Sequence, residues 1–139
     1  MVAFHESIKF PAQIEYLYNF IHFISRCARD QGFPKRRIQE IELAAEEALV
    51  NIFNYAYPEE KGDVEVHCRV DDPGTLICDI MDTGIPFNIL SQADPDLSSD
   101  ILERDIGGLG IFLIKKMADC VAYERKKDQN ILTLTFHKT

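Results

Sequence analysis

Several features that mark particular classes of protein are missing from this sequence. No apolar run approaches the ~20 residues that a membrane-spanning helix needs. The first residues, MVAFHESIKF, lack the basic stretch and the long apolar core of a signal peptide. We therefore expect a cytoplasmic protein with no membrane partner.

Metal-binding and disulfide patterns are missing as well. The four cysteines, Cys27, Cys68, Cys78 and Cys120, form no CxxC pair and have no histidine beside them at zinc-ligand spacing. The histidines form no i, i+4 pair of the kind that a helical metal site uses. We expect reduced cysteines that mostly pack in the interior, and histidines that are structural or lie on the surface.

Positive charge is scarce in this chain. Fifteen lysines and arginines stand against 23 acidic residues, a net charge of −8. The average surface therefore repels phosphate backbones, and we expect no direct nucleic-acid partner. The apolar share of 46% and the charged share of 27% are those of a folded globular protein. At this length we expect a single domain over residues 1–139.

Hydrophobic periodicity predicts the order of the elements. We expect strands over residues 4–10, 63–70, 75–81, 121–125 and 131–136, and helices over about 12–30, 35–57 and 111–118. The polar, acidic stretch 88–106 is expected to be a long loop that acts as a lid. The order β-α-α-β-β, lid, α-β-β predicts an α+β fold, a two-layer α/β sandwich with helices on one face of a mixed, mainly antiparallel sheet.

One face of the second predicted helix carries polar side chains at helical spacing. Glu47 and Asn51 are four residues apart, and at about 100° per residue Asn54 falls within roughly 60° of both. All three lie nearly opposite the apolar stripe of this helix, which is typical of a solvated helix back. However, Leu43 and Ala44 lie near the same side. A functional interpretation is therefore equally open.

A second polar motif, Asp82-Thr83-Gly84-Ile85-Pro86, follows directly after an apolar strand. On its own it is an Asp-Gly turn. Its functional interpretation is an adenine pocket. Asp82 at a strand end accepts a hydrogen bond from an exocyclic amine, while Gly84 lets a flat base approach the backbone.

The third motif is a glycine-rich turn, Gly107-Gly108-Leu109-Gly110, at the start of an amphipathic helix. Free backbone N–H groups and the helix dipole favour anions at such a place, although a flexible hinge is the alternative. The motif lacks the Gly-Lys-Ser/Thr ending of a P-loop. It also does not follow the first strand, as the glycines of a Rossmann site do. Both of those nucleotide-binding folds are therefore excluded.

The three motifs together resemble the GHKL ATPase family with its Bergerat ATP-binding fold. They comprise a Glu-x-x-x-Asn helix, Asp-x-Gly after a strand, a lid, and Gly-x-Gly leading into a helix, and the resemblance covers nearly the whole chain. ELAAEEALVNIFNYAY and ERDIGGLGIFLIKK look most like the anti-sigma-factor serine kinases. Sensor histidine kinases add a two-helix phosphoacceptor module for which the residues before Glu42 leave no space. The large gyrase, mismatch-repair and chaperone relatives need longer chains.

The resemblance implies a role for each matching residue. Asn51 would give its side-chain oxygen to a Mg²⁺ ion that bridges the ATP phosphates. Glu47 would be the general base that takes the proton of a serine or threonine hydroxyl. Asp82 would recognise adenine, with Gly84 beside it, and Arg104 would act near the γ-phosphate as a catalytic residue. The backbone N–H groups of the glycine run would hold the phosphates. The full nucleotide-binding set adds Asn54, Tyr55, Pro86, Gly107, Gly108, Leu109, Gly110 and Ile111.

The sequence also departs from the family pattern. Asn54 stands where many relatives carry a basic residue, Pro86 replaces a glycine, and the lid is strongly acidic. Glu46 is a rival base, but it points roughly 100° away from Glu47 on the helix.

The resemblance implies ATP and Mg²⁺ as cofactors, with a sigma factor and/or an anti-anti-sigma (STAS-type) protein as partner, and a homodimer. The expected function is a serine/threonine kinase that acts as an anti-sigma factor. Two alternatives stay open. One is a non-catalytic module in which ATP sets partner affinity, and the other is a switch kinase that activates a phosphatase.

Overall fold

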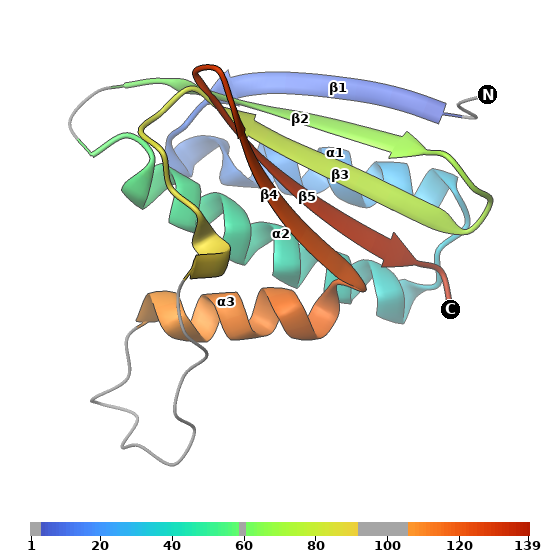
Figure 1. Ribbon diagram of the computed structural model, residues 1–139. Helices are drawn as coiled ribbons and strands as arrows, with labels where there is room; N and C mark the ends of the chain where they lie inside the picture. Colours follow the sequence, from blue (N-terminus) through green and yellow to red (C-terminus); the bar gives the residue numbers. More distant parts are fainter. Residues whose placement is uncertain (1–3, 59–60, 92–105) are drawn as a thin grey trace, which may run out of the picture.

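The computed structural model describes residues 4–58, 61–91 and 106–139. In these residues five strands form one sheet, and three α-helices lie along one of its faces (Figure 1). The two-layer α/β sandwich that the sequence predicts is therefore confirmed.

The described strands pair in an antiparallel manner throughout. They are β1 (Phe4–Pro11), β2 (Asp63–Val70), β3 (Thr75–Asp82), β4 (Cys120–Lys126) and β5 (Gln129–His137). Their order across the sheet is β1-β2-β3-β5-β4. The sheet is thus more uniform than the mixed, mainly antiparallel one expected, because β5 turns back from the edge strand β4 and pairs antiparallel with β3.

The helices are α1 (Leu17–Asp30), α2 (Lys35–Tyr55) and α3 (Ile106–Met117). Two short 3-10 segments, η1 (Ile14–Tyr16) and η2 (Ile89–Ser91), precede α1 and follow β3. Helix α2 lies between α1 and α3 and contacts both (Figure 1). Alternate residues of β2 and β3 face the helices and are buried, as period-two patterning requires. The core therefore lies between the sheet and the helix layer.

Several element boundaries differ from the sequence prediction. The first helix begins at Leu17 rather than near Ala12, because the chain first forms the one-turn segment η1. Helix α2 ends at Tyr55 rather than Tyr57. The carbonyl of Ala56 accepts a hydrogen bond from the N–H of Ile85 at 2.9 Å, which ties the end of this helix to the segment after β3. A contact between distant parts of the chain thus decides where α2 stops.

The start of α3 is the largest local difference. The glycine run was expected to be a turn before a helix over residues 111–118, but the helix begins at Ile106 and includes the glycines. Helical glycines cost roughly 1 kcal/mol each relative to alanine. At Gly110 the lack of a side chain allows close contact with α2.

Arg37 joins the start of α2 to the far ends of two other elements. Its Nη1 donates to the carbonyl of Met117 at the end of α3, and its Nε to that of His137 at the end of β5, both at 2.8 Å. Its guanidinium also forms ion pairs with Glu40 and Asp119. Because its side chain is only 14% exposed, these bonds are partly shielded from water. Arg37 therefore fixes the end of α3 against α2 and the sheet.

The cysteines behave as expected: all four are free, and Cys27, Cys68 and Cys78 are buried, while Cys120 is exposed. Cys68 and Cys78 are cross-strand partners whose sulfurs lie 3.6 Å apart. None of the described helices is long and apolar enough to cross a membrane.

Candidate functional site

Glu47 and Asn51 lie one above the other on α2. The Nδ2 group of Asn51 donates to the backbone carbonyl of Glu47 at 2.7 Å. Since a carbonyl only accepts, this contact settles which end of the amide is the nitrogen and directs Oδ1 away from the helix backbone as an available acceptor. Asn51 is only 5% exposed. The interpretation that this polar face of the helix is simply exposed to solvent is thus wrong for Asn51.

Helix α3 packs against this face of α2, and Gly110 is the residue of α3 that lies close to Glu47 and Asn51. A Cβ on Gly110 would stand 2.8 Å from Oε2 of Glu47 and 3.2 Å from Nδ2 of Asn51. With glycine here the two helices meet without displacing the end of the Glu47 side chain, which any Cβ would push aside. The structure therefore brings the first and third sequence motifs into direct contact.

Partial burial changes the acidity of Glu47. Desolvation raises the pKa of its carboxyl, and the negative charge of Glu46 raises it further. A carboxylate with a raised pKa is a better proton acceptor than an ordinary exposed one. Glu47 thus has the chemistry that a general base requires, and Glu46 contributes to it as a neighbouring charge.

Asp82 ends β3 and is buried, with 3% of its surface exposed. Its Oδ1 accepts two hydrogen bonds, from the N–H of Gly84 at 2.9 Å and from Nδ2 of Asn130 at 2.8 Å. Both donors use Oδ1, and no donor among the described residues bonds Oδ2, which can therefore accept from a ligand. Burial raises the pKa of Asp82, while Asn130, Gly84 and the charge of Arg125 oppose that rise.

Gly84 is required for a reason that the sequence did not show. A Cβ at this position would stand 2.1 Å from the carbonyl oxygen of Ala56. The approach of a base to Gly84 stays a prediction, and the structure adds that this glycine makes room for the end of α2. This contact places the Asp82 segment beside the helix that carries Glu47 and Asn51.

Asn130 is the site residue that sequence reasoning missed, since it falls between the strands expected over residues 121–125 and 131–136, whereas β5 begins at Gln129. It is buried, and its Nδ2 donates to Asp82 Oδ1 and to the carbonyl of Ile85, each at 2.8 Å. Its Oδ1 accepts from the hydroxyl of Tyr123 at 2.5 Å and from the N–H of Phe87 at 3.4 Å. A usable signal was present, because Asn130 shares the parity of the inward-facing leucines of β5.

The other predicted pocket residues are spread over different surroundings. Asn54 and Tyr55 are exposed on the last turns of α2, and the ring of Tyr55 stacks on Phe87 with centroids 5.3 Å apart. Pro86 is exposed. Ile111 is fully buried in the core, which differs from a ligand-facing position.

The glycine run contributes differently from the expectation. Gly107 and Gly108 fall in the first turn of α3, where backbone N–H groups have no partner within the helix, and the N–H of Leu109 is the first that can bond within it. Gly110 is one position further along, where the N–H group bonds within the helix, so its role is the close contact with α2. The predicted catalytic Arg104 and most of the predicted lid lie outside the described residues.

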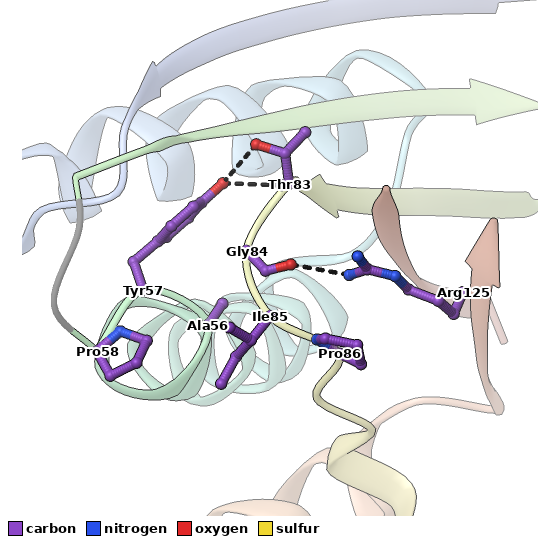
Figure 2. Close-up of a pocket in the computed structure, with 8 residues that line it drawn as sticks. All are labelled: Ala56, Tyr57, Pro58, Thr83, Gly84, Ile85, Pro86 and Arg125. Carbon is purple, nitrogen blue, oxygen red and sulfur yellow. Dashed lines mark hydrogen bonds between the residues drawn. The ribbon is translucent and has the colours of Figure 1, made fainter. Parts of the chain in front are cut away.

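A pocket of about 430 Å³ lies beside the segment after β3, at the end of α2 (Figure 2). Its lining does not include Glu47 or Asn51, so this pocket is separate from the space beside those two residues. It is lined by Ala56, Tyr57, Pro58, Thr83, Gly84, Ile85, Pro86 and Arg125.

The residues present fit an adenine nucleotide with magnesium. Asn51 Oδ1 is a directed amide oxygen, and hard oxygen donors are what Mg²⁺ prefers. The described residues contain no cluster of three or more histidine, cysteine or acidic side chains that could hold a metal. A magnesium ion bound through one protein oxygen and the substrate phosphates needs no such cluster. Asp82 Oδ2 is a buried acceptor of the kind that an exocyclic amine requires.

Comparison with known proteins agrees with this geometry. Serine-protein kinase RsbW of Bacillus cereus (strain Q1) is 26% identical over 129 residues, which cover 90% of this chain and 80% of that protein. Serine-protein kinase RsbW of Listeria monocytogenes serovar 1/2a (strain ATCC BAA-679 / EGD-e) is 29% identical over 128 residues, or 87% and 81% of the two chains.

A solved structure shares the fold. It is the crystal structure of the RsbU and RsbW domains of Rv1364c from Mycobacterium tuberculosis, with a TM-score of 0.68 and 14% identity. The similarity covers 97% of this chain and 32% of that longer chain. The family model described as histidine kinase-like ATPase domain matches residues 10–136. The chain therefore belongs to the histidine kinase-like ATPase domain family, as the GHKL resemblance of its three motifs indicated.

Proposed function

We propose that this protein is an ATP-dependent serine/threonine kinase that acts as an anti-sigma factor and phosphorylates an anti-anti-sigma (STAS-type) partner. The names of its relatives, both serine-protein kinases, favour this function within the family. The observation that carries the proposal is the joint position of Glu47, Asn51 and Gly110 at the contact between α2 and α3.

Each residue has a defined task in this proposal. Bound ATP would supply the phosphoryl group, with Mg²⁺ neutralising charge on its phosphates. Asn51 Oδ1 would hold the metal, and Asp82 Oδ2 would accept a hydrogen bond from the exocyclic amine of adenine. Glu47 would take the proton of the partner hydroxyl as its oxygen bonds to the γ-phosphorus and the bond from that phosphorus to the leaving ADP oxygen breaks.

Radiolabelled ATP with Mg²⁺ and an antagonist-type domain from a neighbouring gene tests the proposal. We expect phosphate on a serine or threonine of that domain with the parent protein, and a loss of at least 100-fold with Glu47→Gln. Glu46→Gln is the matched control, because it removes the same charge one residue away. It should retain activity within a few-fold. Equal activity of the two variants would overturn the role of Glu47.

A non-catalytic module is the second candidate, favoured by Asn54 at a position where relatives carry a basic residue. In that case ATP sets the affinity for a partner and no phosphate is transferred. Partner affinity measured with ATP and with ADP separates the two functions. Nucleotide-dependent binding that leaves no phosphoserine on the partner, and that Glu47→Gln does not change, would favour the module. A switch kinase that activates a phosphatase would use the same residues and differ only in its partner.

A further inference from the structure

Arg125 reaches from β4 to the segment that follows β3. Its Nη1 donates to the carbonyl of Gly84 at 2.8 Å (Figure 2). The N–H of the same glycine donates to Oδ1 of Asp82. Both backbone polar groups of Gly84 are therefore hydrogen-bonded. Its carbonyl accepts from Arg125, and its N–H donates to Asp82, the candidate base-recognition residue.

The charge of Arg125 also acts on Asp82. Burial raises the pKa of Asp82, and Arg125 opposes this by favouring the ionised form. Within the described part of the chain, Arg125 is the charged group that shifts this pKa. The partners of Asp82 on the adjoining strands are Val64 on β2 and Asn130 on β5. Asn130 leads on to the phenol of Tyr123.

The pocket side of the Arg125 guanidinium has no acidic side chain among the described lining residues. Arg125 lines the 430 Å³ pocket of Figure 2, and none of the eight lining residues is acidic. A nearby carboxylate would draw the guanidinium away from Gly84 and cancel its charge. No described residue of the pocket therefore draws Arg125 away from the carbonyl of Gly84 or cancels its charge beside Asp82.

We propose that Arg125 is a positioning residue for base recognition, which holds the carbonyl of Gly84 so that the Asp82–Gly84 segment presents the free carboxylate oxygen to the nucleotide base. The inference rests on the proposed function in one respect, that the ligand of Asp82 is an adenine nucleotide. Arg125 acts through Gly84 and Asp82.

Two variants separate the charge of Arg125 from its hydrogen bond. Arg125→Gln keeps a donor but loses the charge, whereas Arg125→Lys keeps the charge on a single nitrogen. Lys126→Gln, the same charge loss at the exposed neighbouring position, is the matched control. The measurement is the dissociation constant of Mg·ATP by calorimetry, at intervals from about pH 4, the ordinary pKa of an aspartate, up to about pH 8.

For Arg125→Gln we expect Mg·ATP affinity about five- to tenfold weaker at pH 7. Its loss of affinity on acidification should begin at a higher pH than in the parent, because Asp82 without a nearby cation takes up its proton earlier. Arg125→Lys should keep the pH profile of the parent with an affinity about two- to threefold weaker. Lys126→Gln should match the parent in both respects. A shifted pH profile is not expected from a merely structural role.

Each result decides the inference. Parent-like affinity and pH profile in Arg125→Gln would overturn the role of Arg125 and leave the proposed function intact. If Arg125→Gln does not fold, as judged by its circular dichroism, Arg125→Lys decides, and parent-like affinity in that variant would overturn the role. A parent protein that binds no Mg·ATP would overturn the proposed function itself.

Discussion

Asn130 Nδ2 lies 2.8 Å from Asp82 Oδ1, and the two residues face each other as direct partners in the β3–β5 pair. The amide fixes one carboxylate oxygen and thereby decides which oxygen remains for a ligand. The orientation of the candidate base-recognition group is thus set by the central strands of the sheet, which are more rigid than a loop.

Asn130→Ala should destabilise the protein by about 2–4 kcal/mol, because it removes a hydrogen-bond partner from three buried or partly buried polar groups. These are Asp82, the carbonyl of Ile85 and the hydroxyl of Tyr123. Urea denaturation measures the change in the free energy of unfolding. Gln129→Ala, one residue earlier, is the control and should cost less than about 0.5 kcal/mol. Equal effects of the two variants would contradict the prediction.

Asp82→Asn should change the pH dependence of stability. Because burial raises the pKa of Asp82 in the folded state, its contribution to stability is fully present below the unfolded pKa and is lost as the pH rises through the folded pKa. The amide has no charge to bury, so the variant should gain stability relative to the parent as the pH rises from about 4, the ordinary pKa of an aspartate, through the raised pKa of the folded state. Urea denaturation across this range measures the difference, and a constant difference would count against it.

The same Asp82→Asn variant should lose selective binding of Mg·ATP over Mg·GTP. With Oδ1 of the new amide accepting from Gly84 and Asn130, its Nδ2 group replaces the acceptor that adenine would use. Calorimetric titration of both nucleotides provides the measurement. Unchanged adenine selectivity would show that another residue recognises the base.

Gly110→Ala should impair function far more than stability. The added methyl would stand 2.8 Å from Oε2 of Glu47, so this flexible side chain must move. Alanine is a better helix former by about 1 kcal/mol, which offsets part of the cost, and we expect a net change in stability within about 1 kcal/mol. Phosphoryl transfer should fall at least tenfold, since a small displacement of the base is costly. Lys116→Ala, exposed on the same helix, is the control for the labelled-ATP assay.

Arg37→Ala should release the end of α3 and cost about 2–3 kcal/mol of unfolding free energy, because it removes partly buried hydrogen bonds to a charged group. Arg36→Ala is the matched control, since Arg36 is the exposed preceding residue. Thermal or urea denaturation compares the two variants. Arg37→Lys should recover only part of the loss, because a single ammonium group cannot reach Met117, His137 and Asp119 together. Full recovery of the unfolding free energy in Arg37→Lys would contradict the need for a guanidinium that contacts several groups at once.

Local pattern predicted a good part of this protein. Alternation in β2 and β3 and the apolar stripe of α2 follow from the periods of strand and helix, and the structure confirms them. The order of the three motifs identified the family before any geometry was known, and the family match over residues 10–136 agrees. The ends of the helices were predicted less accurately. The end of α2 and the start of α3 depend on contacts with other elements.

The sequence by itself determined the α+β class, the element order and the three polar motifs, because each depends on residues close together in the chain. Tertiary structure decided how those motifs work. It buried Asn51 under α3, explained Gly84 and Gly110 as places where backbones meet, and added Asn130 and Arg125 to the surroundings of Asp82. These relationships join residues from different elements. No local period records them, and they exist only once the sheet and the helix layer have packed together.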